Sequence, residues 1–225
     1  MPNFSGIWTV TQQMQAKGQG IWPTQPPPAI GSAYQGGFFA GQISTAGNGI
    51  ADYNIVVGPV ASAESTSKKY KNVNTATPGA DSVIDGTQNT ADIVADGDST
   101  VYPAGHFCND LVIGGYTDWY MPAMNELEIC YFNLKPTTDA NQPYGINPNA
   151  VPARASAYTS GNPAQTSAAA FVTSTGSEAF FTISYWTSTE FSATNGRLQE
   201  FTMGGQYSDS KTGNLRVRAI RRVAV

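Results

Sequence analysis

One segment of the chain carries a clear helical pattern, and it limits the folds that are open to the rest. Proline is tolerated before a first helical turn and blocks continuation at the end, so Pro122 and Pro136 bracket a helix over residues 124–134. Glu126 lies off its apolar face, and we expect this side chain to be exposed. The apolar side chains recur at helical spacing, at Met124, Leu127, Cys130, Tyr131 and Leu134.

The rest of the chain predicts short strands joined by loops. Residues 34–43 and 53–60 are apolar runs separated by a Gly- and Asn-rich turn, and residues 215–219 alternate apolar and basic side chains. Residues 72–100 are rich in Asn, Thr and Asp and predict a surface excursion with little structure. Residues 135–180 contain five prolines and predict a long loop region. The expected fold class is α+β, strand-rich with one main helix and long loops.

The first thirty residues differ in composition from the remainder of the chain. Residues 1–30 contain Trp8 and Trp22 together with a Pro-Pro-Pro run, which predicts an extended arm that anchors or oligomerises the chain. The two indoles either fold back onto the domain or dock on a neighbouring subunit. Residues 31–225 would then form one domain, long enough to bury a core without a metal ion or a disulfide.

Charge is sparse in this sequence and limits its partners. Charged residues make up 12% of the chain, and 12 Lys and Arg stand against 16 Asp and Glu, for a net charge of −4. This balance argues against nucleic acid as a partner, and no apolar stretch is long enough to predict membrane insertion. The last ten residues hold four basic side chains that either form a solvated strand face or meet acidic loops of a neighbour: Arg216, Arg218, Arg221 and Arg222.

Three blocks of sequence resemble a known family. The first is Gly114-Gly115-Tyr116-Thr117-Asp118-Trp119-Tyr120-Met121-Pro122 followed by Asn125-Glu126-Leu127-Glu128. The second is Tyr185-Trp186-Thr187-Ser188-Thr189-Glu190, and the third is Val217-Arg218-Ala219-Ile220-Arg221. In this order they resemble phage and bacterial C-type-lectin-like domains, a family that includes the C-terminal domain of a collagen-like bacterial adhesin.

The resemblance implies a C-type-lectin-like fold in which the motif residues are structural. Trp119 and Trp186 would be core aromatics, and the Asp118 carboxylate would accept hydrogen bonds at a strand-to-helix corner. The chain departs from the family at Tyr120 and Ala123, and Ala123 lacks the hydroxyl that usually caps the helix. The structural motif set is Gly114, Gly115, Asp118, Trp119, Pro122, Glu126, Leu127, Trp186 and Glu190.

The sequence offers no recognisable catalytic set, so we expect no enzymatic activity and no cofactor. His106 is the only histidine, and its apolar neighbours favour a structural role. Cys108 and Cys130 are expected to be reduced core thiols rather than a disulfide. Asp92, Asp96 and Asp98 lack the further ligands that a calcium loop supplies, and we expect no metal site.

The resemblance implies a phage virion protein, made in the host cytoplasm, that displays long loops for receptor recognition, as in a tail fibre. Candidate ligand contacts in the predicted loop region are Tyr144, Arg154 and Tyr158. The resemblance also implies a homo-oligomer, most simply a trimer, in contact with other virion proteins and with a glycan or protein of the host surface. A capsid decoration or cement protein, a bacterial adhesin domain and a polysaccharide depolymerase remain open as alternatives.

Overall fold

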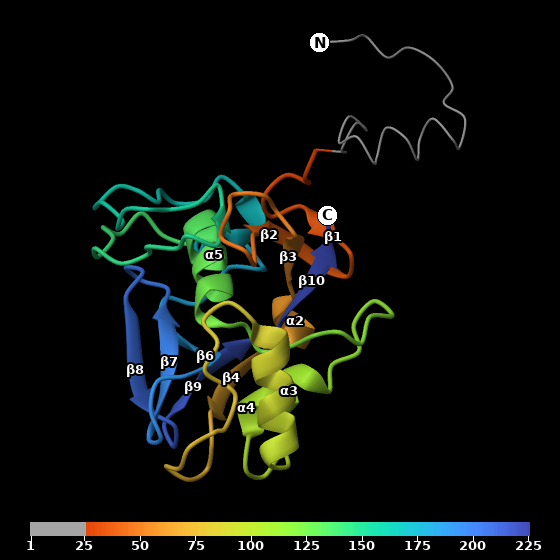
Figure 1. Cartoon of the computed structure of the whole chain (residues 1–225). Coiled ribbons are helices and arrows are strands. Elements are labelled where there is room, and N and C mark those ends of the chain that lie inside the picture. The colour runs from red at the N-terminus through yellow and green to blue at the C-terminus, as the bar shows by residue number, and fades with distance from the viewer. Residues whose placement is uncertain (1–25) are drawn as a thin grey trace.

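The structure is a computed structural model that describes residues 26–225. The predicted contacts of Trp8 and Trp22, and most of the predicted arm, lie outside the described residues. The described chain contains two five-stranded sheets and few helices, which agrees with a strand-rich α+β class (Figure 1).

The first sheet brings together the two ends of the described chain. Its strand order is β1-β2-β3-β10, β5 also pairs with β2, and all the pairs are antiparallel. Gln35 and Gly36 adopt left-handed backbone conformations (φ 48° and 86°) and form the turn between β1 and β2. The sequence predicts one continuous strand here. The strands are β1 (Ala33–Tyr34), β2 (Gly37–Ile43), β3 (Tyr53–Val57), β5 (Ala150–Val151) and β10 (Ile220–Ala224).

The second sheet has the order β4-β9-β6-β7-β8. Only β6 and β9 run parallel; the other neighbours are antiparallel. Because Ala219 alone separates β9 from β10, the C-terminal segment passes directly from the second sheet to the first. The strands are β4 (Glu64–Lys69), β6 (Ser184–Glu190), β7 (Asn195–Glu200), β8 (Gln206–Ser210) and β9 (Asn214–Arg218).

Helix α5 (Met124–Leu134) matches the predicted helix residue for residue. It packs against β2 of the first sheet and against β6 and β7 of the second (Figure 1). Gly41 permits this close approach, because a Cβ atom there would lie 2.8 Å from the Ile129 side chain and 2.5 Å from that of Asn133. The helix is therefore the element that both sheets share.

The prediction of little structure over residues 72–100 is wrong. Helix α3 (Gly86–Asp96) lies in this segment and packs beside α4 (Pro103–Asn109), while the short α2 (Val60–Ala63) follows β3 (Figure 1). The sequence predicts a strand over residues 53–60, but the strand ends at Val57 because α2 begins at Val60. Asp85 caps α3 by accepting a hydrogen bond from the Gln88 amide at 3.2 Å.

The core consists of two clusters of buried side chains. Leu127 and Cys130 belong to one, together with much of the first sheet, and Trp119, Trp186 and Cys108 belong to the other. Trp119 is 2% exposed and Trp186 is fully buried, so the prediction that both are core residues is confirmed. Cys108 and Cys130 are free thiols in different clusters. In residues 26–225 no helix has the length and apolarity to cross a membrane.

Candidate functional site

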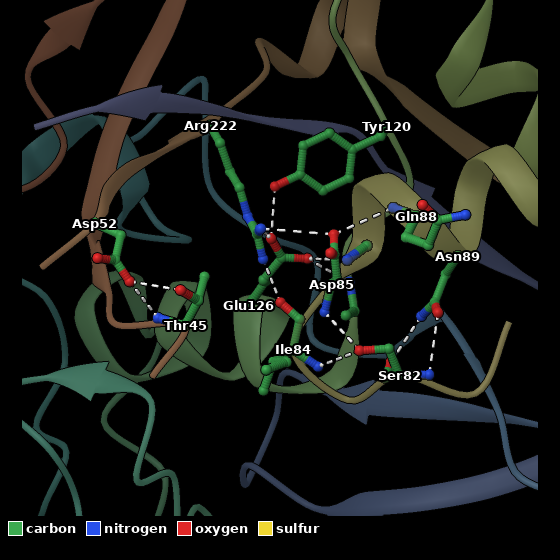
Figure 2. Close-up of polar contacts among 12 residues, drawn as sticks. Thr45, Asp52, Ser82, Ile84, Asp85, Gln88, Asn89, Tyr120, Glu126 and Arg222 are labelled. Carbon is green, nitrogen blue, oxygen red and sulfur yellow. Dashed lines mark hydrogen bonds and ion pairs between the residues drawn. The ribbon is translucent and has the colours of Figure 1, made fainter. Parts of the chain in front are cut away.

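Glu126 was predicted to be exposed, and this is wrong: the side chain is completely buried. One carboxylate oxygen accepts hydrogen bonds from the amides of Ala123 (2.8 Å) and Gly86 (3.0 Å). The other accepts from the Tyr120 hydroxyl (2.5 Å) and from Nε of Arg222 (2.6 Å) (Figure 2). We call these five residues the Glu126 junction, because they join the start of α3, the start of α5 and strand β10.

The four donors explain why a charge can lie here. Burial raises the pKa of Glu126, and the Arg222 guanidinium and the Tyr120 hydroxyl oppose that shift. Ala123 has no hydroxyl to cap α5, and the Thr189 hydroxyl of strand β6 accepts a hydrogen bond from the Met124 amide at 3.1 Å instead. A glutamate at the third helical position is a known capping signal, and it could have identified Glu126 from sequence.

The other motif residues also join distant segments. Asp118 forms a two-point ion pair with Arg221 at 2.7 and 2.8 Å, and the guanidinium lies 3.8 Å from the centre of the Tyr116 ring. Gly114 and Gly115 adopt positive φ angles of 61° and 81° in the turn before this corner. The corner is thereby held against β10.

The second motif block anchors the loop that leads to α3. Glu190 accepts a hydrogen bond from the Thr77 amide at 2.6 Å and pairs with Lys211 at 3.2 Å. The Trp186 indole donates to the Lys68 carbonyl at 2.9 Å. The structure therefore gives Glu190 and Trp186 positions that suit a structural role.

The four C-terminal arginines are already paired within their own chain, so the sequence interpretation in which they meet acidic loops of a neighbour stays a prediction. Each pairs with a carboxylate of its own chain, and Arg218 is only 1% exposed. They do not form a solvated strand face, because the strand is covered. The pairs are Arg216 with Glu64 (2.6 Å), Arg218 with Glu178 (3.0 Å), Arg221 with Asp118 and Arg222 with Glu126.

A pocket of about 350 Å³ opens beside the Glu126 junction. Its lining residues come from β3 and β10 of the first sheet, the start of α3, and the corner that precedes α5. Figure 2 shows four of them, Asp85, Gln88, Tyr120 and Arg222. Its lining carries polar groups and charges of both signs beside apolar surface. The lining residues are Tyr53, Asp85, Thr87, Gln88, Asp118, Tyr120 and Arg222.

Two of the three predicted ligand contacts point inward. Tyr158 is 5% exposed and donates its hydroxyl to the fully buried Glu128. Arg154 pairs with the same carboxylate, with Nε at 3.0 Å, and Asn147 donates to it at 2.6 Å. These four residues form what we call the Glu128 anchor. Arg154 and Tyr158 therefore hold the loop region together rather than present it to a ligand, and the expectation that they form ligand contacts is corrected.

The third predicted contact, Tyr144, is half-buried and stays near the surface. Its ring meets that of Tyr207 edge-on at 5.3 Å. Nearby, Ile146 is 59%, Tyr207 40% and Met203 37% exposed. Hydrogen bonds between residues 142–145 and residues 203–207 hold the two segments that carry these side chains next to each other. We call Tyr144, Ile146, Met203 and Tyr207 the loop-face surface.

Residues 135–183, between α5 and β6, form a platform of loops with little regular structure. Buried polar side chains hold it from within. Lys135 is 1% exposed and donates to the carbonyls of Asp139 and Pro163. The Asn141 amide donates to the carbonyls of Thr159 (3.0 Å) and Pro163 (2.8 Å). The long loop region predicted from sequence is confirmed, and it is internally bonded.

The histidine, the two cysteines and Asp96, which were considered for nucleophilic or metal chemistry, have structural contacts or buried positions. His106 contacts the Gly97 carbonyl at 2.8 Å through Nε2. Burial raises the pKa of both Cys108 and Cys130, so their thiols stay protonated near neutral pH. Asp96 pairs with Lys71 at 3.2 Å. Within the part of the chain that the structure describes, no three metal-ligating side chains gather at one point.

No protein-family model matches this sequence, and no curated protein is significantly similar to it.

Proposed function

We propose that this chain is a recognition protein of a phage virion, built on a C-type-lectin-like domain, with the loop platform as its recognition face. The sequence resemblance supports this proposal. So does the arrangement of its motif residues, since Asp118, Glu126 and Glu190 each join segments that are distant in sequence. A domain whose loops vary in sequence would still need these residues, because they hold its scaffold together.

The observation that carries the proposal is a large loop platform that is anchored internally and still exposes aromatic and apolar side chains. A loop that is already ordered loses less conformational entropy when it binds. Tyrosine provides a large contact area with few rotatable bonds, and clustered exposed apolar side chains mark interaction sites. At the loop-face surface, Ile146 of the platform is 59% exposed, and Tyr144 of the platform packs edge-on against Tyr207 of β8, which is 40% exposed.

Cell-surface binding tests this proposal. The fluorescently labelled chain is incubated with a panel of bacterial strains and with isolated phage capsids, and bound protein is counted by flow cytometry or sedimentation. We expect binding to the cells of particular strains. The double variant Ile146→Ser, Tyr207→Ser should reduce that binding at least about tenfold, because it removes the apolar contact area.

The matched control is Val112→Ser, which changes an apolar side chain that is 69% exposed and lies outside the loop platform. We expect this variant to bind the same strains as the unchanged chain. Equal binding by the loop-face variant and the control would contradict the proposal. Binding to capsids in place of cells would assign the chain to capsid decoration.

A further inference from the structure

Two Asn-Gly pairs occur in the sequence, and the structure places them in different surroundings. Asn48-Gly49 lies in the exposed loop between β2 and β3. Asn195-Gly196 lies in strand β7, where Gly196 is buried and pairs with Asp209 of β8. In an Asn-Gly pair the glycine nitrogen can attack the asparagine side chain, because glycine has no Cβ to obstruct the approach.

The loop that carries Asn48 is fixed at its base. Asp52 accepts hydrogen bonds on one oxygen from the amide (2.7 Å) and the hydroxyl (2.6 Å) of Thr45 across the loop (Figure 2). The buried Ser44 donates its amide to the Asn149 carbonyl at 2.7 Å. The loop is therefore exposed at its tip and anchored where it leaves the sheet.

Two donors hold the side-chain carbonyl of Asn48. Its Oδ1 atom accepts hydrogen bonds from the Ser44 hydroxyl and from the Ile50 amide, both at 2.9 Å. Because a backbone amide can only donate, the Ile50 contact identifies this atom as the oxygen of the side-chain amide. Negative charge develops on this oxygen when a nucleophile attacks Cγ, so the two donors stabilise the tetrahedral intermediate.

The nucleophile is the backbone nitrogen of Gly49. Among residues 26–225, its N–H finds no hydrogen-bond acceptor, and neither does Nδ2 of Asn48. A Cβ atom at Gly49, whose φ is 80°, would meet nothing within 4 Å. The attacking nitrogen and the leaving nitrogen are therefore both open to water, whereas Gly196 is enclosed between neighbouring strands.

From this geometry we propose that Asn48 is a site of spontaneous deamidation through a succinimide. A base in solution removes the amide proton of Gly49, and the nitrogen forms a bond to Cγ of Asn48. The Cγ–Nδ2 bond then breaks, and Nδ2 takes a proton from water and leaves as ammonia. One water molecule opens the ring at either carbonyl and yields aspartate or isoaspartate, with no change in oxidation state.

Both products change the loop. Each adds one negative charge to a chain whose net charge is −4. The isoaspartate product also lengthens the main chain by one CH₂ group and places the former side-chain carbonyl in the main chain, so the Ile50 amide loses its present acceptor. The inference goes beyond the proposed function and does not depend on it, since the loop-face surface contains no residue of this loop.

Peptide mapping by mass spectrometry tests the proposal on the full chain. The protein is kept at body temperature in mildly alkaline and in mildly acidic buffer made with heavy-oxygen water, and electron-transfer fragmentation distinguishes isoaspartate from aspartate. We expect Asn48 to deamidate at least about tenfold faster than Asn195, a barrier difference of about 1.4 kcal/mol. The reaction should be faster in the alkaline buffer and should add one heavy oxygen atom, and both products should form.

Two variants and one unfolded sample locate the cause. Gly49→Ala should slow the reaction at Asn48 at least about tenfold, because the methyl group shields the attacking nitrogen. The matched control is Gly115→Ala, at a glycine with a φ of 81° and equally open surroundings, and it should leave the rate unchanged. Unfolding in guanidinium should accelerate Asn195 and not Asn48, because the fold protects only Asn195.

Four results would overturn the proposal. They are deamidation of Asn48 no faster than that of Asn195, an unchanged rate in Gly49→Ala, products without heavy oxygen, and an acceleration of Asn48 on unfolding as large as that of Asn195.

Discussion

Three glutamates of this chain keep their side chains inside the fold, each against arginine. Glu126, Glu128 and Glu64 are at most 2% exposed at the side chain. Removing one partner of a buried pair leaves the other charge uncompensated and costs about 3–5 kcal/mol, much more than the loss of a surface pair. The arginines that face them are Arg222, Arg154, Arg216 and Arg218.

Glu126→Ala tests this at the junction. The change leaves Arg222 without its carboxylate and removes an acceptor from the first turns of α3 and α5. We expect the free energy of unfolding, measured by urea denaturation, to fall by about 3–5 kcal/mol. Asp110→Ala, at an exposed site, should change it by no more than about 0.5 kcal/mol. A loss below about 1 kcal/mol for Glu126→Ala would show that the junction carries little of the stability.

Asp96 gives the protein a part of its acid sensitivity. A hydrogen bond from the Tyr102 hydroxyl, together with Lys71, lowers the pKa of this carboxyl below its ordinary value of 3.8. The unfolded chain therefore binds this proton more readily than the folded one. The stability that Asp96 contributes is present above pH 3.8 and is lost as the pH falls through the lower, folded pKa.

We expect Asp96→Asn to unfold with a weaker dependence on pH in this acidic range. Thermal denaturation between about pH 2 and pH 6 measures the effect, since protons are no longer taken up at this residue on unfolding. Asp110→Asn provides the comparison, and it should keep the slope of the unchanged chain. Parallel curves for all three proteins would contradict the assignment.

For single residues, the sequence indicates which apolar side chains are buried, but it does not indicate which charged side chains are buried. The family motifs that contain Trp119 and Trp186 imply that both are core residues, and an indole can fill a core position. The sequence predicts an exposed Glu126 and a ligand-contacting Tyr158, and both predictions are wrong. The residues that bury these two side chains are distant in sequence, so no local pattern indicates their burial. Arg222 pairs with Glu126 across 96 positions, and no local pattern reports such a contact.

At the scale of elements, α5 was predictable and α3 was not, for one physical reason. The buried residues of α5 include Glu126 and Glu128, but most of them are apolar and recur at helical spacing, so the helix is visible in the sequence. The buried face of α3 includes Asn89 and Thr90, and Ile93 is its one large apolar member. Asn89 donates to the Ser82 carbonyl (2.7 Å) and to the hydroxyl of Ser188 (3.1 Å). A helix that is buried through polar contacts leaves no apolar stripe.

Leu127→Ala measures what α5 contributes as the shared helix. Leu127 is 1% exposed and packs in the first core cluster, so the change should cost about 2–5 kcal/mol of unfolding free energy. Chemical denaturation gives the value, and Val112→Ala, at an exposed site, should stay within about 0.5 kcal/mol of the unchanged chain. A cost of Leu127→Ala below about 1 kcal/mol would be inconsistent with a close-packed helix between the sheets.

At the scale of the whole molecule, the two sheets and the loop platform depend on contacts between segments far apart in the chain. The C-terminal segment crosses from one sheet to the other, and α5 packs on both. The loop platform comes directly after α5 and is attached to it through the Glu128 anchor. The fold class and the extent of the loop region could be predicted from sequence, whereas the anchor could not, because it consists of polar residues with no periodicity.

The recognition proposal requires that the loop platform hold one shape before it meets a ligand. Its backbone amides bond within the platform and to the end of α5: Asn141 to Ser160 (3.0 Å), Tyr158 to Tyr144 (2.7 Å) and Thr166 to Lys135 (2.9 Å). Hydrogen exchange of the free, full-length protein, followed amide by amide by NMR, tests this requirement most directly.

We expect these three amides to be protected to a degree comparable with those of α5, although they lie in loops. In the Arg154→Ala variant, which removes one member of the Glu128 anchor, residues 141–160 should lose protection while β6 to β8 keep theirs. Exchange of all three amides in the unchanged protein at the rate of an unstructured peptide would contradict the account, because a mobile platform could not serve as a preorganised recognition face.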